Sequence, residues 1–457
     1  MAGSEAKSWV VATLNSLFSM LVFTYCSAFI LFRAGDVVHL AKNAQFVQAL
    51  FVFAFANFLL PRLTGIRLPG PRVLALLTVA GIYYFLDVHT AERSFPPADL
   101  TGKVAVVTGA NSGIGYATAW ALAARNATVV MGCRSDRKCQ KAAAELTASA
   151  VEAAPLGPSV GELVPMRLDL ADLAVVDYFS LMVAQKYPRV DILVNNAGYF
   201  VRKQEPPTRQ GLERSFGSMH IGHFALTEWI IRRNKGGAKG LSVMNVASGM
   251  HHFCQLYTLE RGLTGGGWDD ACLPREFFKA GFRETGRKGY MPMKHWPGAL
   301  RALVDVRYHR AKLANVLHTY ELPKRHKGVF ASSADLGFAA SNITVMHKAL
   351  NQNLGNIVSV DDLQIMRKGL PHGIRPVLLG ATYPFVKKWA RGVGIKDKNG
   401  GLFDPIGDAS AAFTLEKALG MKDIGGQKKL AKQLYDASAK IFADFEKSRN
   451  GSMDEQR

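Results

Sequence analysis

The sequence is poor in cysteine and in acidic residues. Its five cysteines, among 457 residues, lie without the spacing of a zinc site, at positions 26, 133, 139, 254 and 272, so we expect no metal centre. We also expect no disulfide at Cys133, and no residue pattern indicates an oxidising compartment. The 36 acidic residues are outnumbered by 56 lysines and arginines, which gives a net charge of +20. No nucleic-acid-binding motif is present, so an anionic membrane surface is the expected partner of this charge.

Charge is also absent from the beginning of the chain. Residues 9–32 form an apolar stretch long enough to cross a hydrocarbon core, and 44–60 and 73–86 are shorter apolar stretches. A cleaved signal peptide fits poorly, because the first stretch is too long and further apolar segments follow it. We therefore predict a membrane anchor of two or three segments over residues 1–94.

The orientation of this anchor depends on basic residues in the link between the second and third segments. Arg62, Arg67 and Arg72 lie in this link, and cytoplasmic loops are enriched in such residues. If the first two segments form a hairpin, the rest of the chain faces the cytosol, on endoplasmic reticulum or lipid-droplet membranes. If the third segment also crosses, the rest of the chain is lumenal. We favour the hairpin.

Beyond the anchor, short β-branched runs alternate with helix-like stretches. The expected strands are 103–108, 128–133, 163–169, 191–197, 241–248 and 328–334. This alternation predicts an α/β domain over residues 100–420, with a doubly wound parallel sheet of the Rossmann type covered by helices on both faces. Ligands bind such sheets beyond the carboxyl ends of the strands.

A glycine-rich turn, TGANSGIG at 108–115, follows the first strand and opens a helix. Its spacing is G-x-x-x-G-x-G and lacks the G-x-G-x-x-G pattern of longer dehydrogenases. Free N–H groups at such a helix start form an anion site that suits a pyrophosphate. The residues expected to bind it are Gly109, Asn111, Ser112, Gly113, Ile114 and Gly115.

The second strand ends without the acidic residue that would bind a ribose 2′-hydroxyl. Arg134 and, one turn later, Lys138 stand there instead, and a guanidinium pairs with a 2′-phosphate. Asp136 weakens this argument, but its position fits the start of the next helix. We predict NADP(H) as the cofactor, with NAD(H) as the alternative.

Tyr308 and Lys312 are four positions apart and therefore share one helix face. A free phenol is a poor acid at neutral pH, and we expect the neighbouring cation to lower its pKa. Ser248, at the end of the fifth strand, offers a hydroxyl to hold the reacting oxygen. These three residues are the predicted catalytic groups.

The chain resembles the short-chain dehydrogenase/reductase family, and most closely its retinol-dehydrogenase-type branch. The motifs that carry the resemblance occur in the family's order within residues 100–340, and they are TGANSGIG at 108–115, CRSDRK at 133–138, LDL at 168–170, NNAG at 195–198, HIGHFALT at 220–227, NVAS at 245–248 and YHRAKLANV at 308–316. The resemblance implies that Asp169 and Leu170 border the adenine and that Asn196, Ala197 and Gly198 lie beneath the cofactor. Tyr308 and Lys312 would also contact the cofactor.

Two departures from the family pattern stand out. Met219 occupies the position of an Asn that relays protons through water, so His220 or a water molecule takes over that role, or turnover is slow or lost. An insertion at about 255–303 separates Ser248 from Tyr308, and it mixes aromatic with basic residues. This insertion is a membrane contact, a lid over an apolar substrate or a surface elaboration.

The carboxyl-terminal part, 421–457, contains a predicted amphipathic helix at 426–447 and a predicted disordered tail at 448–457. Taken together, the patterns predict a membrane-bound oxidoreductase that transfers a hydride between NADP(H) and a lipophilic alcohol or carbonyl compound. The alternative is an NADP(H)-binding structural or assembly protein that has kept the fold and lost turnover.

Overall fold

The computed structural model describes residues 96–152, 161–199, 205–248, 251, 254, 272–283, 306–336, 374–392, 399, 401–403, 409–410 and 424–454. These residues belong to one compact unit. Within them, no helix is both long enough and apolar enough to cross a bilayer. The predicted anchor segments lie outside the described residues.

An eight-stranded sheet forms the centre of the described part, in the order β3-β2-β1-β4-β5-β6-β7-β8. All neighbouring pairs are parallel except β7 and β8, which are antiparallel. The strands are β1 (Val104–Thr108), β2 (Thr128–Cys133), β3 (Leu163–Arg167), β4 (Ile192–Asn195), β5 (Ser242–Val246), β6 (Phe330–Ala334), β7 (Gly401–Phe403) and β8 (Ala409–Ser410). The six predicted strands and the doubly wound parallel architecture are confirmed, whereas β7 and β8 were not predicted.

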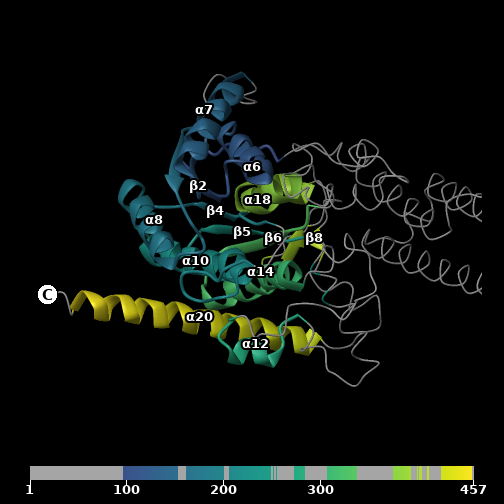
Figure 1. Cartoon of the computed structure of the whole chain (residues 1–457). Coiled ribbons are helices and arrows are strands. Elements are labelled where there is room, and N and C mark those ends of the chain that lie inside the picture. Colours follow the sequence, from purple (N-terminus) through teal and green to yellow (C-terminus); the bar gives the residue numbers. More distant parts are fainter. Residues whose placement is uncertain are drawn as a thin grey trace, which may run out of the picture. The chain divides into compact units, whose positions relative to one another are not determined.

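Three helices cover one face of the sheet (Figure 1): α6 (Gly113–Ala123), α7 (Asp136–Glu152) and α18 (Arg375–Gly392). The helix α6 is buried over most of its surface, with Ala117, Ala119 and Ala121 in the core. Such small side chains let the helix lie close to the strands, which brings its amino terminus to the carboxyl end of β1.

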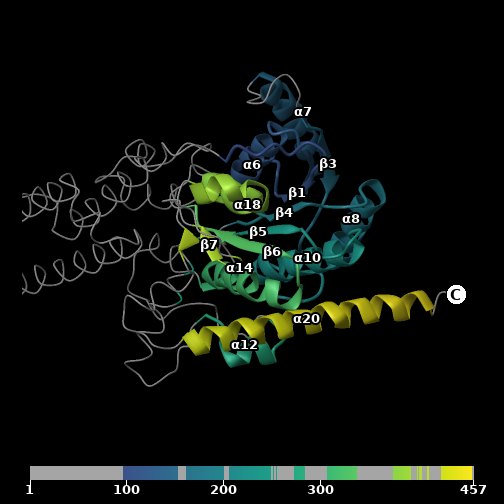
Figure 2. The same ribbon diagram turned by 180° about the vertical axis from the view of Figure 1, so that it is seen from behind.

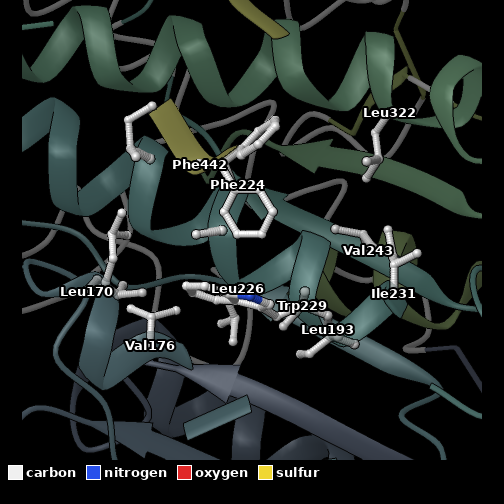
Figure 3. Close-up of a cluster of buried hydrophobic side chains, with 14 of the residues drawn as sticks. Leu170, Val176, Leu193, Phe224, Leu226, Trp229, Ile231, Val243, Leu322 and Phe442 are labelled. Atoms are coloured by element: carbon white, nitrogen blue, oxygen red, sulfur yellow. The ribbon is translucent and has the colours of Figure 1, made fainter. Parts of the chain in front are cut away.

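The other face is covered by α8 (Leu173–Lys186), α10 (Gly222–Arg233) and α14 (Val306–Arg325). Figure 2 shows the long helix α20 (Ile424–Asp454) running outside this layer. Its Phe442 is buried against Trp229 and Phe224 of α10, with ring centroids 4.9 Å and 6.3 Å away (Figure 3). The predicted amphipathic helix therefore packs on the domain.

This helix is longer than expected, because it continues to Asp454 through most of the tail that was predicted to be disordered. The last turns have partners on the domain. Glu446 accepts hydrogen bonds from Arg232 at 2.7 and 2.8 Å, and Arg449 pairs with Asp177 of α8. Composition alone did not show these contacts, since the partners lie on elements distant in the sequence.

The expectation for the cysteines is corrected as well. Cys133 is bonded to Cys139, and Cys254 to Cys272. The turn between β2 and α7 folds back, so that the Cα atoms of Cys133 and Cys139 lie 5.8 Å apart. The expectation of no disulfide at Cys133 is therefore wrong, because the strand end lies next to the first turns of α7, which carry its partner.

The described part of the insertion includes α12 (Arg275–Lys279), and it is packed on the domain. Phe277 and Phe282 are buried against Phe216, with ring centroids 5.1 Å and 4.6 Å away. The Arg310 guanidinium lies 4.0 Å from the centre of the Phe277 ring. In these twelve residues the aromatic side chains serve as core, while the other aromatic residues of the insertion lie outside the described residues.

Candidate active site

The topological switch point of the sheet lies between β1 and β4, where the chain passes from one half of the sheet to the other. The glycine-rich loop follows β1, and the loop with Asn196, Ala197 and Gly198 follows β4. Gly109 has φ +67°, which favours glycine, and its amide donates to Gly132 O at 2.7 Å. The loop is thus held over the edge of the sheet.

The start of α6 is open to a ligand. Ser112 precedes the helix in an extended conformation, is exposed, and its side chain accepts no hydrogen bond from the first turn. A Cβ added at Gly115 would lie 2.4 Å from Gly109 O and 2.5 Å from Asn196 Nδ2. Only glycine at position 115 allows the start of α6 to approach the loops after β1 and β4 this closely. The N–H groups of the helix start then lie at the switch point. This cradle suits the pyrophosphate of a dinucleotide.

Thr108, the last residue of β1, ties the two loops together. Its Oγ1 accepts hydrogen bonds from the amides of Asn196 and Ala197, both at 2.9 Å. The Asn196 side chain returns a hydrogen bond from Nδ2 to Thr108 O at 2.8 Å. The two predicted cofactor-binding segments therefore form one hydrogen-bonded unit.

The residues expected around the adenosine half lie at the ends of β2 and β3. Arg134 follows β2 directly and is exposed. The half-buried Asp169 has one carboxylate oxygen held by the amide of Ala171 at 3.0 Å. Leu170 is buried in the core, and its carbonyl oxygen lies where a Cβ at Gly222 would be 2.4 Å away.

The three predicted catalytic residues meet beyond the carboxyl end of β5. Tyr308 and Lys312 lie on one face of α14, and the Lys312 ammonium is 5.6 Å from the centre of the Tyr308 ring. Lys312 Nζ donates to Val246 O at 2.8 Å. Tyr308 shares a hydrogen bond with Ser248. Residues separated widely in the sequence thus surround one point beside the cofactor loops.

The electrostatics of Tyr308 differ from the expectation. Burial raises the pKa of Tyr308 to about 12, the hydrogen bond from Ser248 lowers it, and the charge of Asp335 raises it further. The expected lowering of this pKa by Lys312 is not found, because the desolvation of the buried phenol dominates and the net shift is upward. The phenol of Tyr308 is therefore neutral at pH 7.

Asp335 was not singled out by the sequence analysis. It is buried directly after β6, next to the end of β5, where Ala247 N donates to Ala334 O at 2.8 Å. Its position after a predicted strand was the one available signal. Burial also lowers the pKa of Lys312, to about 8.

Met219 lies at the centre of this arrangement. It is buried with Tyr308 and Ala311, in the π-helical turn η2 (Gly217–Ile221) that connects α9 (Arg214–Phe216) to α10. A Cβ at Gly198 would be 3.4 Å from its sulfur and 3.3 Å from Lys312 Nζ. The hypothesis that His220 replaces the missing Asn receives no support, because His220 Nε2 faces Ser438 of α20 at 3.0 Å.

Comparisons with known proteins agree with this geometry. The family model described as short chain dehydrogenase matches residues 103–254. Human retinol dehydrogenase 14 is 34% identical over 248 residues, which cover 53% of this chain and 62% of its own. Mouse retinol dehydrogenase 12 is 32% identical over 281 residues, 60% of this chain and 74% of its own. Human retinol dehydrogenase 13 is 36% identical over 179 residues, 39% of this chain and 51% of its own. The chain thus spans less than two thirds of the length of two of these relatives.

Proposed function

This chain belongs to the short-chain dehydrogenase/reductase family and is of the retinol-dehydrogenase type, and we propose from this that it is a membrane-bound, NADP(H)-dependent oxidoreductase of a lipophilic alcohol or carbonyl compound. The observation that carries the proposal is the convergence of Ser248, Tyr308 and Lys312 beside the glycine-rich loop. Each group has a role in carbonyl reduction or its reverse.

The proton chemistry belongs to these three side chains. Tyr308, neutral at pH 7, donates its proton to the substrate oxygen in reduction and accepts it in oxidation. The Ser248 hydroxyl holds the same oxygen. Lys312, fixed by Val246 O, is a cation at neutral pH and stabilises negative charge on the phenol oxygen as the proton leaves. A nicotinamide, when bound above the loops after β1 and β4, would supply or accept the hydride.

The proposed choice of NADP(H) rests on Arg134. The residue is exposed at the carboxyl end of β2, where no acidic side chain occupies the strand end. A 2′-phosphate would pair with its guanidinium. The acid nearest along the chain, Asp136, begins α7, where it interacts favourably with the helix dipole.

The proposed substrate class rests on the named relatives and on the amino-terminal composition. Three relatives bear the name retinol dehydrogenase. A retinoid, steroid, prenol or fatty aldehyde partitions into a membrane, and an enzyme that takes it up gains from an anchor such as 1–94. The proposed site is the endoplasmic reticulum or a lipid droplet, with the domain in the cytosol.

The test uses the purified full chain with NADPH or NADH and a panel of retinal, steroid ketones and long-chain aldehydes. Turnover of at least one panel member, faster with NADPH, is the expected result. Tight binding of NADPH without turnover of any substrate would favour the alternative, a nucleotide-binding structural protein. The observation that supports this alternative is Met219, which occupies the position of the relay Asn.

A further inference from the structure

His223 is buried among the loops of the active site, and both of its ring nitrogens have polar partners. Its Nδ1 lies 2.9 Å from Met219 O, and its Nε2 lies 2.8 Å from Thr108 Oγ1. The residue is the second of α10, two positions after the end of the π-helical turn η2. None of the roles assigned above uses this side chain.

The partners fix which nitrogen carries the proton. A carbonyl oxygen only accepts hydrogen bonds, so Nδ1 is an N–H donor toward Met219 O. Burial lowers the pKa of His223 to about 3, so the ring is neutral and Nε2 is an acceptor. The Thr108 hydroxyl therefore donates to Nε2 at 2.8 Å, in preference to Val194 O at 3.4 Å.

With its proton directed at His223, Thr108 Oγ1 keeps both lone pairs for the amides of Asn196 and Ala197. A continuous chain of hydrogen bonds thus runs from the Met219 carbonyl through the imidazole to the loop after β4. The contacts of His223 with Met219 O and Thr108 Oγ1 are buried, and those of Thr108 Oγ1 with the two amides are partly buried. The Asn196 amide also donates to Val194 O at 3.0 Å.

The Met219 end of the chain has a second support. Asn315 lies one turn after Lys312 on α14, and only one orientation of its amide gives both amide atoms compatible partners. In that orientation its nitrogen donates to Met219 O at 3.0 Å and to Ala311 O at 3.3 Å. The turn that packs Met219 against Tyr308 is therefore held from α10 and from α14.

We infer that His223 is a positioning residue, which acts as a neutral Nδ1–H imidazole and couples the Met219 turn beside Tyr308 to the loop that carries Asn196 and Ala197. The inference rests on the proposed function, because the two ends it joins are the proton donor and the cofactor loop. It assigns separate consequences to the two nitrogens. The Nδ1 side keeps Tyr308 in place for turnover, and the Nε2 side keeps the cofactor loop in place for binding.

The first test is the tautomer itself. The full chain, labelled with ¹⁵N at histidine, is examined by NMR at neutral pH, with His223→Phe used to assign the signal. A neutral ring protonated at Nδ1 is expected. A ring protonated at Nε2, or a doubly protonated ring, overturns the inference whether or not the protein turns over any substrate.

The second test separates the two nitrogens. His223→Asn keeps a donor near Nδ1 and loses the acceptor for Thr108. Its dissociation constants for NADPH and NADH should rise about tenfold at unchanged kcat, the effect of one lost buried hydrogen bond. His223→Gln keeps the acceptor and loses the donor to Met219 O, so its kcat should fall about tenfold at unchanged coenzyme affinity.

The matched control is His318→Phe. His318 is equally buried and packs against Phe224, and within the described residues its Nε2 has no hydrogen-bond partner. This variant should keep the kcat and the coenzyme dissociation constants of the wild type. Equal losses in His223→Asn and His223→Gln, or losses in melting temperature alone, would show that His223 is only a packing residue. If the wild type binds coenzyme but turns over no substrate, the proposed function fails. The coenzyme affinity of His223→Asn and the tautomer of His223 in the wild type then still test the role of His223.

Discussion

At the scale of single residues, the proposed chemistry depends on a phenol that keeps its proton. Burial and the charge of Asp335 raise the pKa of Tyr308 to about 12, which suits a group that donates a proton at neutral pH. Tyr308→Phe removes this donor and little volume. Its kcat should fall at least about a hundredfold while coenzyme affinity is retained, as measured by steady-state kinetics and coenzyme titration. A variant with about a tenth of the wild-type rate would refute the assigned role.

Lys312 is a buried cation, so the charge that its proposed role requires lowers the stability of the fold. Burial lowers its pKa from 10.5 to about 8, so the native state releases a proton that the unfolded chain holds up to pH 10.5. Between these values the unfolded state binds more protons, and stability rises with pH. Below pH 8 the full cost of the buried charge, roughly 3 kcal/mol, is present.

Lys312→Met should therefore abolish activity and yet unfold less readily at pH 7. The expected gain is about 1 kcal/mol and not the full cost of roughly 3 kcal/mol, because the substitution also removes the hydrogen bond to Val246 O. The gain should shrink above pH 8 and reverse near pH 9. Urea unfolding of both proteins at several pH values measures the difference, and a gain that grows with pH would contradict the assignment.

Arg134 is the residue on which the proposed preference for NADPH depends. Arg134→Ala should raise the dissociation constant for NADPH about tenfold or more and leave that for NADH nearly unchanged, because only NADPH carries the 2′-phosphate. Lys138→Ala, at an exposed position one turn later, is the control and should have a smaller effect. Equal losses for both coenzymes would show that Arg134 is not the selector.

At the scale of elements, α20 acts as part of the domain. Its Tyr435 donates to the buried Glu228 of α10 at 2.6 Å, and Phe442 fills the space between Trp229 and Phe224. Phe442→Ala should lower the free energy of unfolding by about 3–5 kcal/mol, because it leaves a cavity in the core. Phe445→Ala, on the same helix but only half-buried, should cost clearly less. Similar losses in thermal unfolding would contradict this packing.

At the scale of the whole molecule, the sheet and its helices form a compact unit that includes residues 95–411 and 423–457. The strands that carry the site begin only at Val104. Deleting residues 1–94 should therefore leave a folded protein that binds NADPH with unchanged affinity, as circular dichroism and coenzyme titration would measure.

The same deletion tests the proposed anchor. The truncated protein should leave the membrane fraction, and its activity on a membrane-dissolved substrate should fall much more than its activity on a short water-soluble analogue. Carbonate and high-salt extraction of the full chain separates a spanning segment from electrostatic attachment, which salt screens. Equal losses of both activities would show that 1–94 supports the domain rather than substrate uptake.

The sequence by itself determined the features that depend on local pattern. β-Branched runs predicted six strands, and because parallel strands end at one edge, they also predicted which loops converge there. The spacing of Tyr308 and Lys312 is enough to place both on one helix face, because residues four apart are neighbours on a helix. The glycines of the loop after β1 predicted an anion site for the same local reason.

Tertiary structure alone decided what depends on contacts between distant residues. The strands β7 and β8 have only three and two residues, too few for a periodic signal, and they form by pairing with each other and with β6. The direction of the Tyr308 pKa shift depends on its burial and on Asp335, and neither is visible in the spacing to Lys312. The tautomer of His223 likewise depends on Met219 O and Thr108 Oγ1, which folding brings to opposite sides of one ring.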